Sequence, residues 1–138
     1  MDCIFCKIIK GEIPAIKVLD EQKVLAFMDI NPLAQGHMLV IPKKHAENIL
    51  DISEDDLAAV IHAVKRCAKA VKRELKAEGI TVLQLNGKAS DQVASHFHVH
   101  IIPRWENDGL PISIWEVKKV DMEEIKDIAR KVKKNICS

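Results

Sequence analysis

The sequence predicts a single α+β domain, residues 1–138, in which helices cover one face of an antiparallel sheet. Two observations lead to this class: strand-like runs follow one another directly, and few helix-like segments separate them, unlike the regular alternation of a parallel sheet. A chain of 138 residues buries about two thirds of its unfolded surface, so it needs no disulfide to fold. We find no repeat and no linker-like run that would mark a boundary.

Three short strands are expected first. Residues 16–19 and 24–30 are apolar runs on either side of a turn at 20–23. Residues 37–42 form a third run, which ends at a proline. Their succession favours an antiparallel meander.

A long helix is expected after these strands. Ser53 precedes it, and Asp56 three residues further on completes a capping-box arrangement. Its apolar positions recur at helical spacing and form one stripe: Leu57, Val60, Ile61, Val64, Ala68, Val71 and Leu75. Gly79 is expected to end the helix in the C′ position.

Two strands and a second helix complete the chain. Residues 80–85 are apolar and β-branched, residues 86–95 form a polar loop, and residues 96–102 form the last strand. Asp121 and Glu124 are expected to cap an amphipathic helix. Its inward-facing side chains should be Met122, Ile125, Ile128, Ala129 and Val132.

Composition limits the partners of the chain. Its 21 Lys+Arg and 20 Asp+Glu leave a net charge of +1, so we expect neither nucleic acid nor a membrane surface as a partner. No stretch has the length and apolar character of a secretory signal or a membrane span, which favours a cytoplasmic protein. Cys67 and Cys137 are interpreted as plain thiols.

Histidines alternate with apolar residues from His96 to Ile102. On a strand, alternate side chains point to opposite faces, so the histidines share one face and the apolar residues share the other. His96 and His100 would lie about 13 Å apart and could not both bind one ion. A neutral imidazole can attack phosphorus or bind a metal, so the histidines should have different roles.

Cys3 and Cys6 form a C-x-x-C pair, which can bring two thiolates to one metal. Alone, the pair supplies half of a tetrahedral site. A redox pair is an alternative, although thioredoxin-like motifs normally follow a strand. Two plain reduced thiols are another.

Four segments together resemble the Hint-like branch of the histidine triad (HIT) superfamily. In chain order they are CIFCKIIKGEIPA, AFMDINPLAQGHMLVIPKKH, NGKASDQ and HFHVHIIPR, and the resemblance covers most of residues 1–103. It implies a five-stranded antiparallel sheet packed with a long helix, here followed by a C-terminal helix. It also implies a homodimer and nucleotidyl hydrolysis or transfer through a covalent nucleotidyl-histidine.

The resemblance assigns catalytic roles to three histidines. His98 would be the nucleophile, because covalent catalysis splits one displacement at a crowded phosphorus into two. A backbone carbonyl on its other nitrogen would hold one tautomer. His100 would contact the α-phosphate and, when protonated, would stabilise developing charge. His37 would assist the same phosphate, unless it is simply a polar strand residue.

The resemblance also implies a site for a purine nucleotide. Asp29 would accept both ribose hydroxyls, unless it is only a turn residue. Gln92 would bind phosphate, and Asn86 matches a loop asparagine of some members. Five apolar residues would wall the base pocket, and they could belong to the core as well: Ile4, Phe5, Ile8, Phe27 and Ile30.

Some relatives with the N-terminal cysteine pair bind structural zinc. The matching positions here are Cys3, Cys6, His45 and His96. A closed set of two cysteines and two histidines leaves no open coordination position, so Zn²⁺ would be structural rather than catalytic. His96 would then serve the metal while His98 reaches phosphorus.

The loop before the triad departs from the family pattern. Leu85 replaces an asparagine, and Asp91 replaces a glycine that approaches phosphate, where an anionic side chain would repel the substrate unless it points away. Val93 replaces a hydroxyl that contacts the leaving group in many relatives. These changes affect substrate preference and rate, and they leave the nucleophile intact.

The leading interpretation is a zinc-stabilised hydrolase, a phosphoramidase that acts on purine nucleoside monophosphates joined to an amine. A dinucleoside polyphosphate hydrolase would use the same nucleophile on a longer substrate. A nucleotide-binding module with little turnover is the third interpretation.

Overall fold

The computed structural model describes residues 2–110 and 117–136. The backbone contacts divide the chain into two compact units, Met1–Asp108 and Gly109–Ser138, which we describe separately. The prediction of one domain for residues 1–138 stays a prediction.

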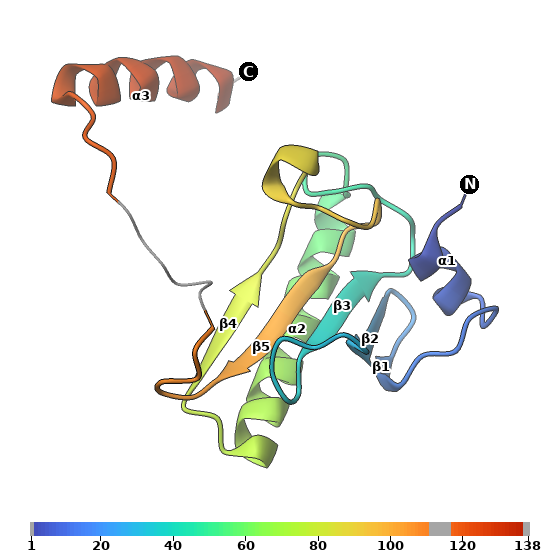
Figure 1. The fold of residues 1–138 in the computed structure, drawn as a ribbon. Coiled ribbons are helices and arrows are strands. Elements are labelled where there is room, and N and C mark those ends of the chain that lie inside the picture. Colours follow the sequence, from blue (N-terminus) through green and yellow to red (C-terminus); the bar gives the residue numbers. More distant parts are fainter. Residues whose placement is uncertain (1, 111–116, 137–138) are drawn as a thin grey trace. The chain divides into compact units, whose positions relative to one another are not determined.

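The first unit contains one five-stranded antiparallel sheet (Figure 1). Its strands are β1 (Lys17–Asp20), β2 (Val24–Met28), β3 (Met38–Pro42), β4 (Gly79–Leu83) and β5 (Val99–Arg104). Their order across the sheet is β1-β2-β3-β5-β4, so β5 inserts between β3 and β4. The predicted α+β class and the five-stranded sheet are therefore confirmed, although each strand differs from its predicted bounds by one or more residues.

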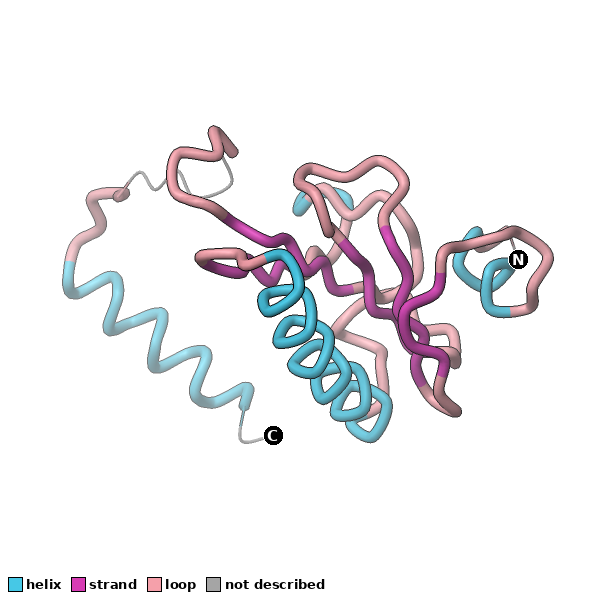
Figure 2. The backbone as a smooth tube through the Cα atoms, turned by 90° about the horizontal axis from the view of Figure 1, so that it is seen from below, coloured by secondary structure: helices cyan, strands magenta, loops and turns pink. Residues whose placement is uncertain are grey.

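The long helix α2 (Glu54–Leu75) packs against four of the five strands (Figure 2). Its beginning follows the prediction, because the Ser53 side chain accepts a hydrogen bond from the backbone N–H of Asp56 at 3.2 Å. The predicted end at Gly79 is wrong. Lys76 ends the helix in the left-handed conformation, with φ of 54°, and Gly79 is the first residue of β4.

A short helix, α1 (Ile4–Ile9), was not expected from the sequence. The Cys3 thiol caps it by accepting a hydrogen bond from the backbone N–H of Cys6 at 3.3 Å. Phe5 and Ile8 pack on the side of the sheet that α2 does not cover, together with Leu25, Phe27, Leu39 and Ile41. Helices therefore lie on both faces of the sheet, and the expectation that helices cover one face is wrong.

The strands β2 and β3 supply both cores. Their odd and even positions alternate between the α1 side, with Leu25 and Phe27, and the α2 side, with Val24 and Ala26. Because both faces are covered, these strands are continuous apolar runs rather than alternating ones.

The histidine tract enters the sheet later than predicted. β5 begins at Val99, so His96 and His98 precede the strand instead of belonging to it. The backbone N–H of Phe97 donates to Ala46 O at 2.7 Å, a loop contact outside the strand ladder. The predicted alternation is confirmed, because Phe97, Val99 and Ile101 are all buried in the core under α2.

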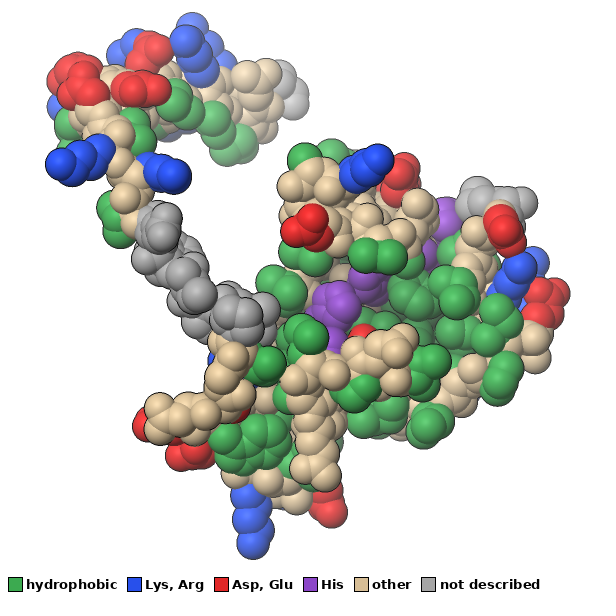
Figure 3. All heavy atoms as spheres, in the orientation of Figure 1, with side chains coloured by type: hydrophobic (Ala, Val, Ile, Leu, Met, Phe, Trp, Pro, Cys, Tyr) green, Lys and Arg blue, Asp and Glu red, His purple; other side chains and the backbone are tan. Residues whose placement is uncertain are grey.

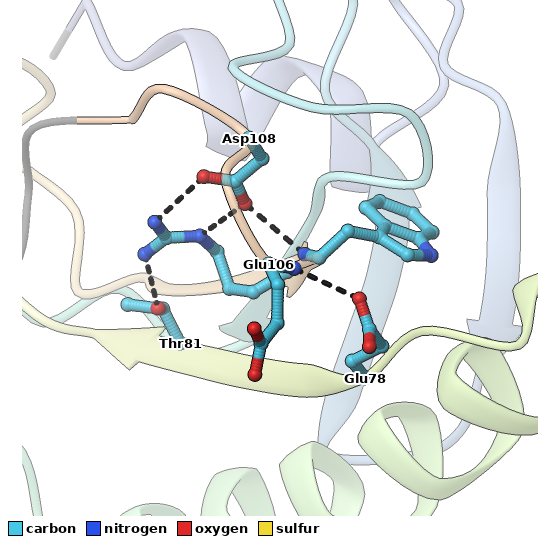
Figure 4. A network of polar contacts seen from close by, with 6 residues as sticks. Glu78, Thr81, Glu106 and Asp108 are labelled. Carbon is cyan, nitrogen blue, oxygen red and sulfur yellow. Dashed lines mark hydrogen bonds and ion pairs between the residues drawn. The ribbon is translucent and has the colours of Figure 1, made fainter.

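A polar network holds the chain where it leaves β5 (Figure 4). The Arg104 guanidinium donates to both carboxylate oxygens of Asp108, at 2.7 and 3.0 Å, and to the Thr81 hydroxyl at 3.0 Å. The backbone N–H of Glu106 donates to the Glu78 carboxylate at 2.8 Å. The turn after β5 is thereby tied to Glu78, which directly precedes β4, and to Thr81 within β4.

The described part of the second unit contains α3 (Met122–Ile136), which begins directly after Asp121 as predicted. None of its residues is buried within this unit, and the expectation that its apolar side chains face inward stays a prediction. Within residues 2–110 and 117–136, no helix is both long enough and apolar enough to cross a bilayer.

Candidate active site and metal centre

Histidine side chains gather along one line on the face of the first unit shown in Figure 3, recessed between apolar side chains. This is the face that α2 leaves free, since the residues between the histidines point into the core under α2. The rings of His98 and His100 lie 5.1 Å apart, and those of His37 and His100 also 5.1 Å. Sheet pairing explains the second contact, because β3 follows His37 and places Leu39 opposite His100.

His98 is held in a single tautomer. Its Nδ1 lies 2.7 Å from the backbone oxygen of His96. A carbonyl oxygen only accepts, so Nδ1 carries the proton and the lone pair is on Nε2. The imidazole is almost fully buried. His98 therefore presents a nucleophilic nitrogen in a fixed orientation without a separate base.

His37 and His100 form a directed pair. The backbone N–H of Leu33 donates to Nδ1 of His37 at 3.0 Å, so the proton of His37 is on Nε2. That Nε2–H donates to Nδ1 of His100 at 2.9 Å. The remaining proton of His100 is consequently on Nε2. Two contacts thus make His100 a neutral hydrogen-bond donor.

Burial keeps this pair uncharged. Burial, together with repulsion from His98 and His37, lowers the pKa of His100 to about 4, although Asp29 opposes that change. Burial also lowers the pKa of His37, although Asp29 opposes that change. In the free protein, His100 is therefore neutral at neutral pH, and its protonation beside a bound phosphate stays a prediction. An Nε2–H bond remains for donation to an anion.

Asp29 lies beside this pair at the end of β2. Its carboxylate accepts a hydrogen bond from Asn31 N at 2.8 Å and lies 3.5 Å from Nε2 of His37. The side chain is partly buried. The structure thus brings Asp29 into the histidine site, as the sequence predicted.

Four potential metal ligands come together from three segments. Cys6 comes from α1 and Cys3 from its N-cap, His45 comes from the loop after β3, and His96 from the segment before β5. Nδ1 of His96 lies 3.4 Å from Cys3 Sγ and 3.6 Å from Cys6 Sγ. Nδ1 of His45 lies 3.3 Å from Cys6 Sγ and 3.1 Å from Nδ1 of His96.

These separations fit a tetrahedral zinc ion. Zinc bonds of about 2.3 Å to sulfur and 2.05 Å to nitrogen give edges of about 3.6 Å between S and N and about 3.3 Å between two N atoms. The tautomer of His96 fits too, because its Nε2 is 2.8 Å from the Pro42 carbonyl and so carries the proton, leaving the Nδ1 lone pair for the cluster. The four residues can hold Zn²⁺.

Asp29, His37 and His100 form a second group whose potential ligand atoms lie close together. This group is not suited to hold a metal ion. Nδ1 of His37 already accepts from the Leu33 amide, so its Nε2 is protonated and offers no lone pair. Tautomers therefore separate the two groups: the cysteine cluster suits a cation and the histidine pair suits an anion.

The predicted base-pocket residues divide by exposure. Phe5, Ile8 and Phe27 are buried, whereas Ile4 and Ile30 are exposed. The Phe5 ring packs edge-on against His98, with centroids 5.3 Å apart. This apolar surface therefore begins directly beside the nucleophile.

Gln92 and Asn86 hold the loop before the triad. The Gln92 amide accepts from Gly87 N at 2.7 Å and donates to the backbone oxygens of Glu47 and Ala94. Asn86 accepts from Ile49 N at 2.8 Å and pairs with the Gln84 amide. Both residues thus fix the loop, and a direct phosphate contact for either stays a prediction.

Two of the three loop departures, Asp91 and Val93, are exposed, and Leu85 is partly buried. Asp91 has φ of 63°, a left-handed conformation that suits glycine and that aspartate tolerates better than most residues. Val93 is 94% exposed. Both side chains are thus open to solvent.

Sequence reasoning missed the main-chain partners of the histidines, the Leu33 amide and the Pro42 carbonyl. Backbone atoms leave no signal in residue identity. The carbonyl on His98 was expected and is the one of His96. Cys67 is buried in α2 as expected, and Cys137 lies outside the described residues.

Comparisons with known proteins point to one family. The HIT domain model matches residues 10–107. The adenosine 5′-monophosphoramidase of Schizosaccharomyces pombe is 39% identical over 137 residues, which cover 99% of each chain.

Solved structures agree. A HIT family protein from Bacillus subtilis matches with a TM-score of 0.91 at 38% identity, over 97% of this chain and 96% of that one. A Zn-bound histidine triad family protein from Mycobacterium smegmatis matches with a TM-score of 0.76 at 34% identity, over 90% of this chain and 87% of that one.

Proposed function

This chain belongs to the HIT domain family, and we propose that it is a hydrolase for purine nucleoside phosphoramidates, in which an amine is joined to the phosphorus of a nucleoside monophosphate. The observation that carries the proposal is the tautomer of His98, whose Nδ1 proton is held by the His96 carbonyl so that Nε2 is free to attack. The name of the fission yeast relative supports an adenosine nucleotide as the substrate.

In the first step, Nε2 of His98 attacks phosphorus and the P–N bond to the amine breaks. The amine keeps the electron pair of that bond and takes a proton from solvent. The new nucleotidyl-histidine carries a positive charge, which the His96 carbonyl stabilises through the retained Nδ1 proton. Water then attacks phosphorus, releases its proton to solvent, and frees the nucleoside monophosphate and neutral His98.

His100 acts on the phosphate through its Nε2–H, which stabilises charge on a non-bridging oxygen as the transition state forms. His37 supports this donor by fixing the other nitrogen of His100. Such a pair is already oriented in the free protein, so no reorganisation is needed when charge develops.

The nucleoside would lie between Asp29 and α1. The carboxylate of Asp29 accepts the ribose hydroxyls, and the base lies on the apolar surface of Phe5, Ile8 and Phe27, with Ile4 and Ile30 at its exposed edge. Gln92 and Asn86 position the phosphate-side loop. Buried apolar walls with few polar groups are typical of small-molecule sites.

Zn²⁺ is proposed as a structural ion on Cys3, Cys6, His45 and His96, supported by the tetrahedral spacing of their donor atoms and by the Zn-bound relative. It would join α1 to the segment before β5. Ligands that must stay reduced favour the cytoplasm as the location of the protein. Neither a nucleic acid nor a membrane is proposed as a partner.

We also propose that two chains form a homodimer. Strand β4 is at one edge of the sheet, and the apolar stripe of α3 is exposed. Charge along α3 is acidic at Glu123 and Glu124 and basic at Lys133 and Lys134, so two antiparallel copies of the helix would match in charge. Sedimentation of the full chain and of an Ile125→Glu variant tests this, and equal masses at one dimeric value would remove α3 from the interface.

The experiment that tests the function compares two substrates. Wild-type protein should hydrolyse adenosine phosphoramidate faster than a dinucleoside polyphosphate, and His98→Ala should hydrolyse neither. Faster cleavage of the dinucleoside polyphosphate would favour the second kind of hydrolase. Tight binding of nucleotide with no turnover of either compound would favour a binding module.

A further inference from the structure

The proposed metal cluster and the nucleophile meet in one residue, His96. Its imidazole is fully buried, with Nδ1 in the cluster and Nε2 on the Pro42 carbonyl. Its own backbone oxygen accepts the Nδ1 proton of His98 at 2.7 Å. A displacement of the His96 side chain therefore reaches the atom that sets the tautomer of His98.

Helix α1 makes a second connection. Cys3 and Cys6 turn their sulfur atoms toward the cluster, and Phe5 stands between them in sequence. The Phe5 ring lies edge-on to both histidines, with centroids 5.9 Å from His96 and 5.3 Å from His98. The helix that supplies two ligands thus also supplies one wall against the nucleophile.

The cluster is arranged around one centre. Four potential ligand atoms surround it, and the Nδ1 atoms of His45 and His96 are only 3.1 Å apart. A cation bound there would tie His45 and α1 to His96, so loss of the cation removes that tie.

We propose that metal bound at Cys3, Cys6, His45 and His96 positions the nucleophile, by fixing the His96 carbonyl and the Phe5 ring against His98. The proposal rests on the function assigned above and deepens it, because it makes metal occupancy a determinant of turnover. The ion takes no part in the chemistry. Loss of the partners that orient a metal-linked group typically costs about 10- to 100-fold in activity, which sets the expected size of the effect.

The matched variants are His45→Ala and His45→Cys. The polar contacts of His45 are with Cys6 and His96, so both changes act on the cluster and leave the nucleotide-binding residues in place. His45→Ala removes a ligand. His45→Cys leaves three thiolates and one histidine, a set that binds structural zinc in other proteins. His62→Ala, at an exposed position of α2, is the control for loss of a histidine elsewhere.

Three quantities are measured on the full-length protein: zinc bound per chain, kcat and KM for adenosine phosphoramidate, and the ¹⁵N chemical shifts of the His98 imidazole. We expect His45→Ala to lose zinc, to lower kcat about 10- to 100-fold, and to lose the single-tautomer ¹⁵N pattern of His98. His45→Cys should retain zinc, kcat and the His98 pattern. A chelator should lower the zinc content and kcat of wild-type protein to those of His45→Ala and remove the His98 pattern. Its circular dichroism spectrum should stay unchanged.

Two results would overturn the proposal. One is a zinc-free His45→Ala protein with wild-type kcat and an unchanged His98 spectrum. The other is a zinc-loaded His45→Cys protein as slow as His45→Ala, since the metal would then not be the cause. If His45→Ala does not fold, kcat of wild-type protein must rise in proportion to zinc as the ion is returned to chelated chains. If wild-type protein has no turnover, the proposed function fails, and the ¹⁵N spectra with and without zinc still decide the positioning.

Discussion

Replacing Gly36 by alanine should destabilise the protein and disturb its active site together. Gly36 has φ of +88°, and an added Cβ would lie 2.4 Å from Leu75 Cδ1 and 3.1 Å from both Val71 Cγ2 and Pro103 Cγ. The left-handed backbone costs an alanine about 1–2 kcal/mol. Overpacking against α2 adds about 1–3 kcal/mol. The free energy of unfolding should therefore fall by about 2–5 kcal/mol.

Gly11→Ala is the matched control. Gly11 has φ of +80° but nothing within 4 Å of the added Cβ, so only the backbone cost of about 1–2 kcal/mol applies. Urea unfolding of both variants at equal m-value isolates the packing contribution as their difference. Equal losses in the two variants would refute the claim that α2 and the loop before β3 are in close contact.

The same substitution should affect turnover. Gly36 directly precedes His37, whose backbone oxygen accepts from Asp29 N at 3.0 Å. A shift of the chain away from Leu75 therefore moves His37, whose Nε2–H donates to His100. We expect kcat to fall in Gly36→Ala and to stay at the wild-type value in Gly11→Ala. Unchanged kcat in Gly36→Ala would contradict the claim that the loop before β3 positions His37 in the active site.

Three further predictions concern the polar contacts. The buried imidazole of His100 resists protonation that the unfolded chain accepts, so its contribution to stability is present above about pH 6.5 and is lost as the pH falls toward 4, by at most about 1.5 kcal/mol between pH 6.5 and 5. Urea melts of wild type and His100→Asn should show a smaller loss in the variant, and equal losses would contradict this. His37→Ala should leave His100 without its fixed tautomer and lower kcat by about 10- to 100-fold at unchanged zinc content, as measured by steady-state kinetics; wild-type kcat would remove His37 from the mechanism. Arg104→Lys should lose the bidentate contact with Asp108 and lower the free energy of unfolding by about 1–2 kcal/mol in urea melts, while no change would mean that the network in Figure 4 adds little.

Side-chain periodicity predicted the parts of the fold that depend on packing. The alternation around His98 is confirmed because the core under α2 needs Phe97 and Val99 on one face, and this fixes the histidines on the other. The start of α2 follows from Ser53, since an unsatisfied amide needs a local acceptor. These features are predictable because each is encoded in a few neighbouring residues.

Other elements have no such local signal. Helix α1 has only six residues, too few to show an apolar stripe that recurs over several turns. It is stabilised by contacts with β2 and β3. The end of α2 at Lys76 uses a left-handed lysine, so the nearby glycine was misleading. The amphipathic stripe of α3 indicates an apolar face, but it does not say what covers that face.

The candidate site divides in the same way. Residue types and the family resemblance predicted which side chains meet at the metal cluster and at His98. The tautomers depend on backbone atoms of Leu33, Pro42 and His96. The positions of these atoms are known only from the three-dimensional structure. The neutral state of His100 depends on its burial beside two other imidazoles, which no sequence pattern states.

The central claim is that Nε2 of His98 attacks phosphorus and carries the nucleotide. Its most direct test is mass spectrometry of protein quenched during turnover of adenosine phosphoramidate, followed by peptide mapping of the adduct. We predict one nucleotidyl group on His98, formed and lost at rates consistent with kcat, and no adduct in His98→Ala. An adduct on another residue, or steady turnover by His98→Ala, would contradict the account.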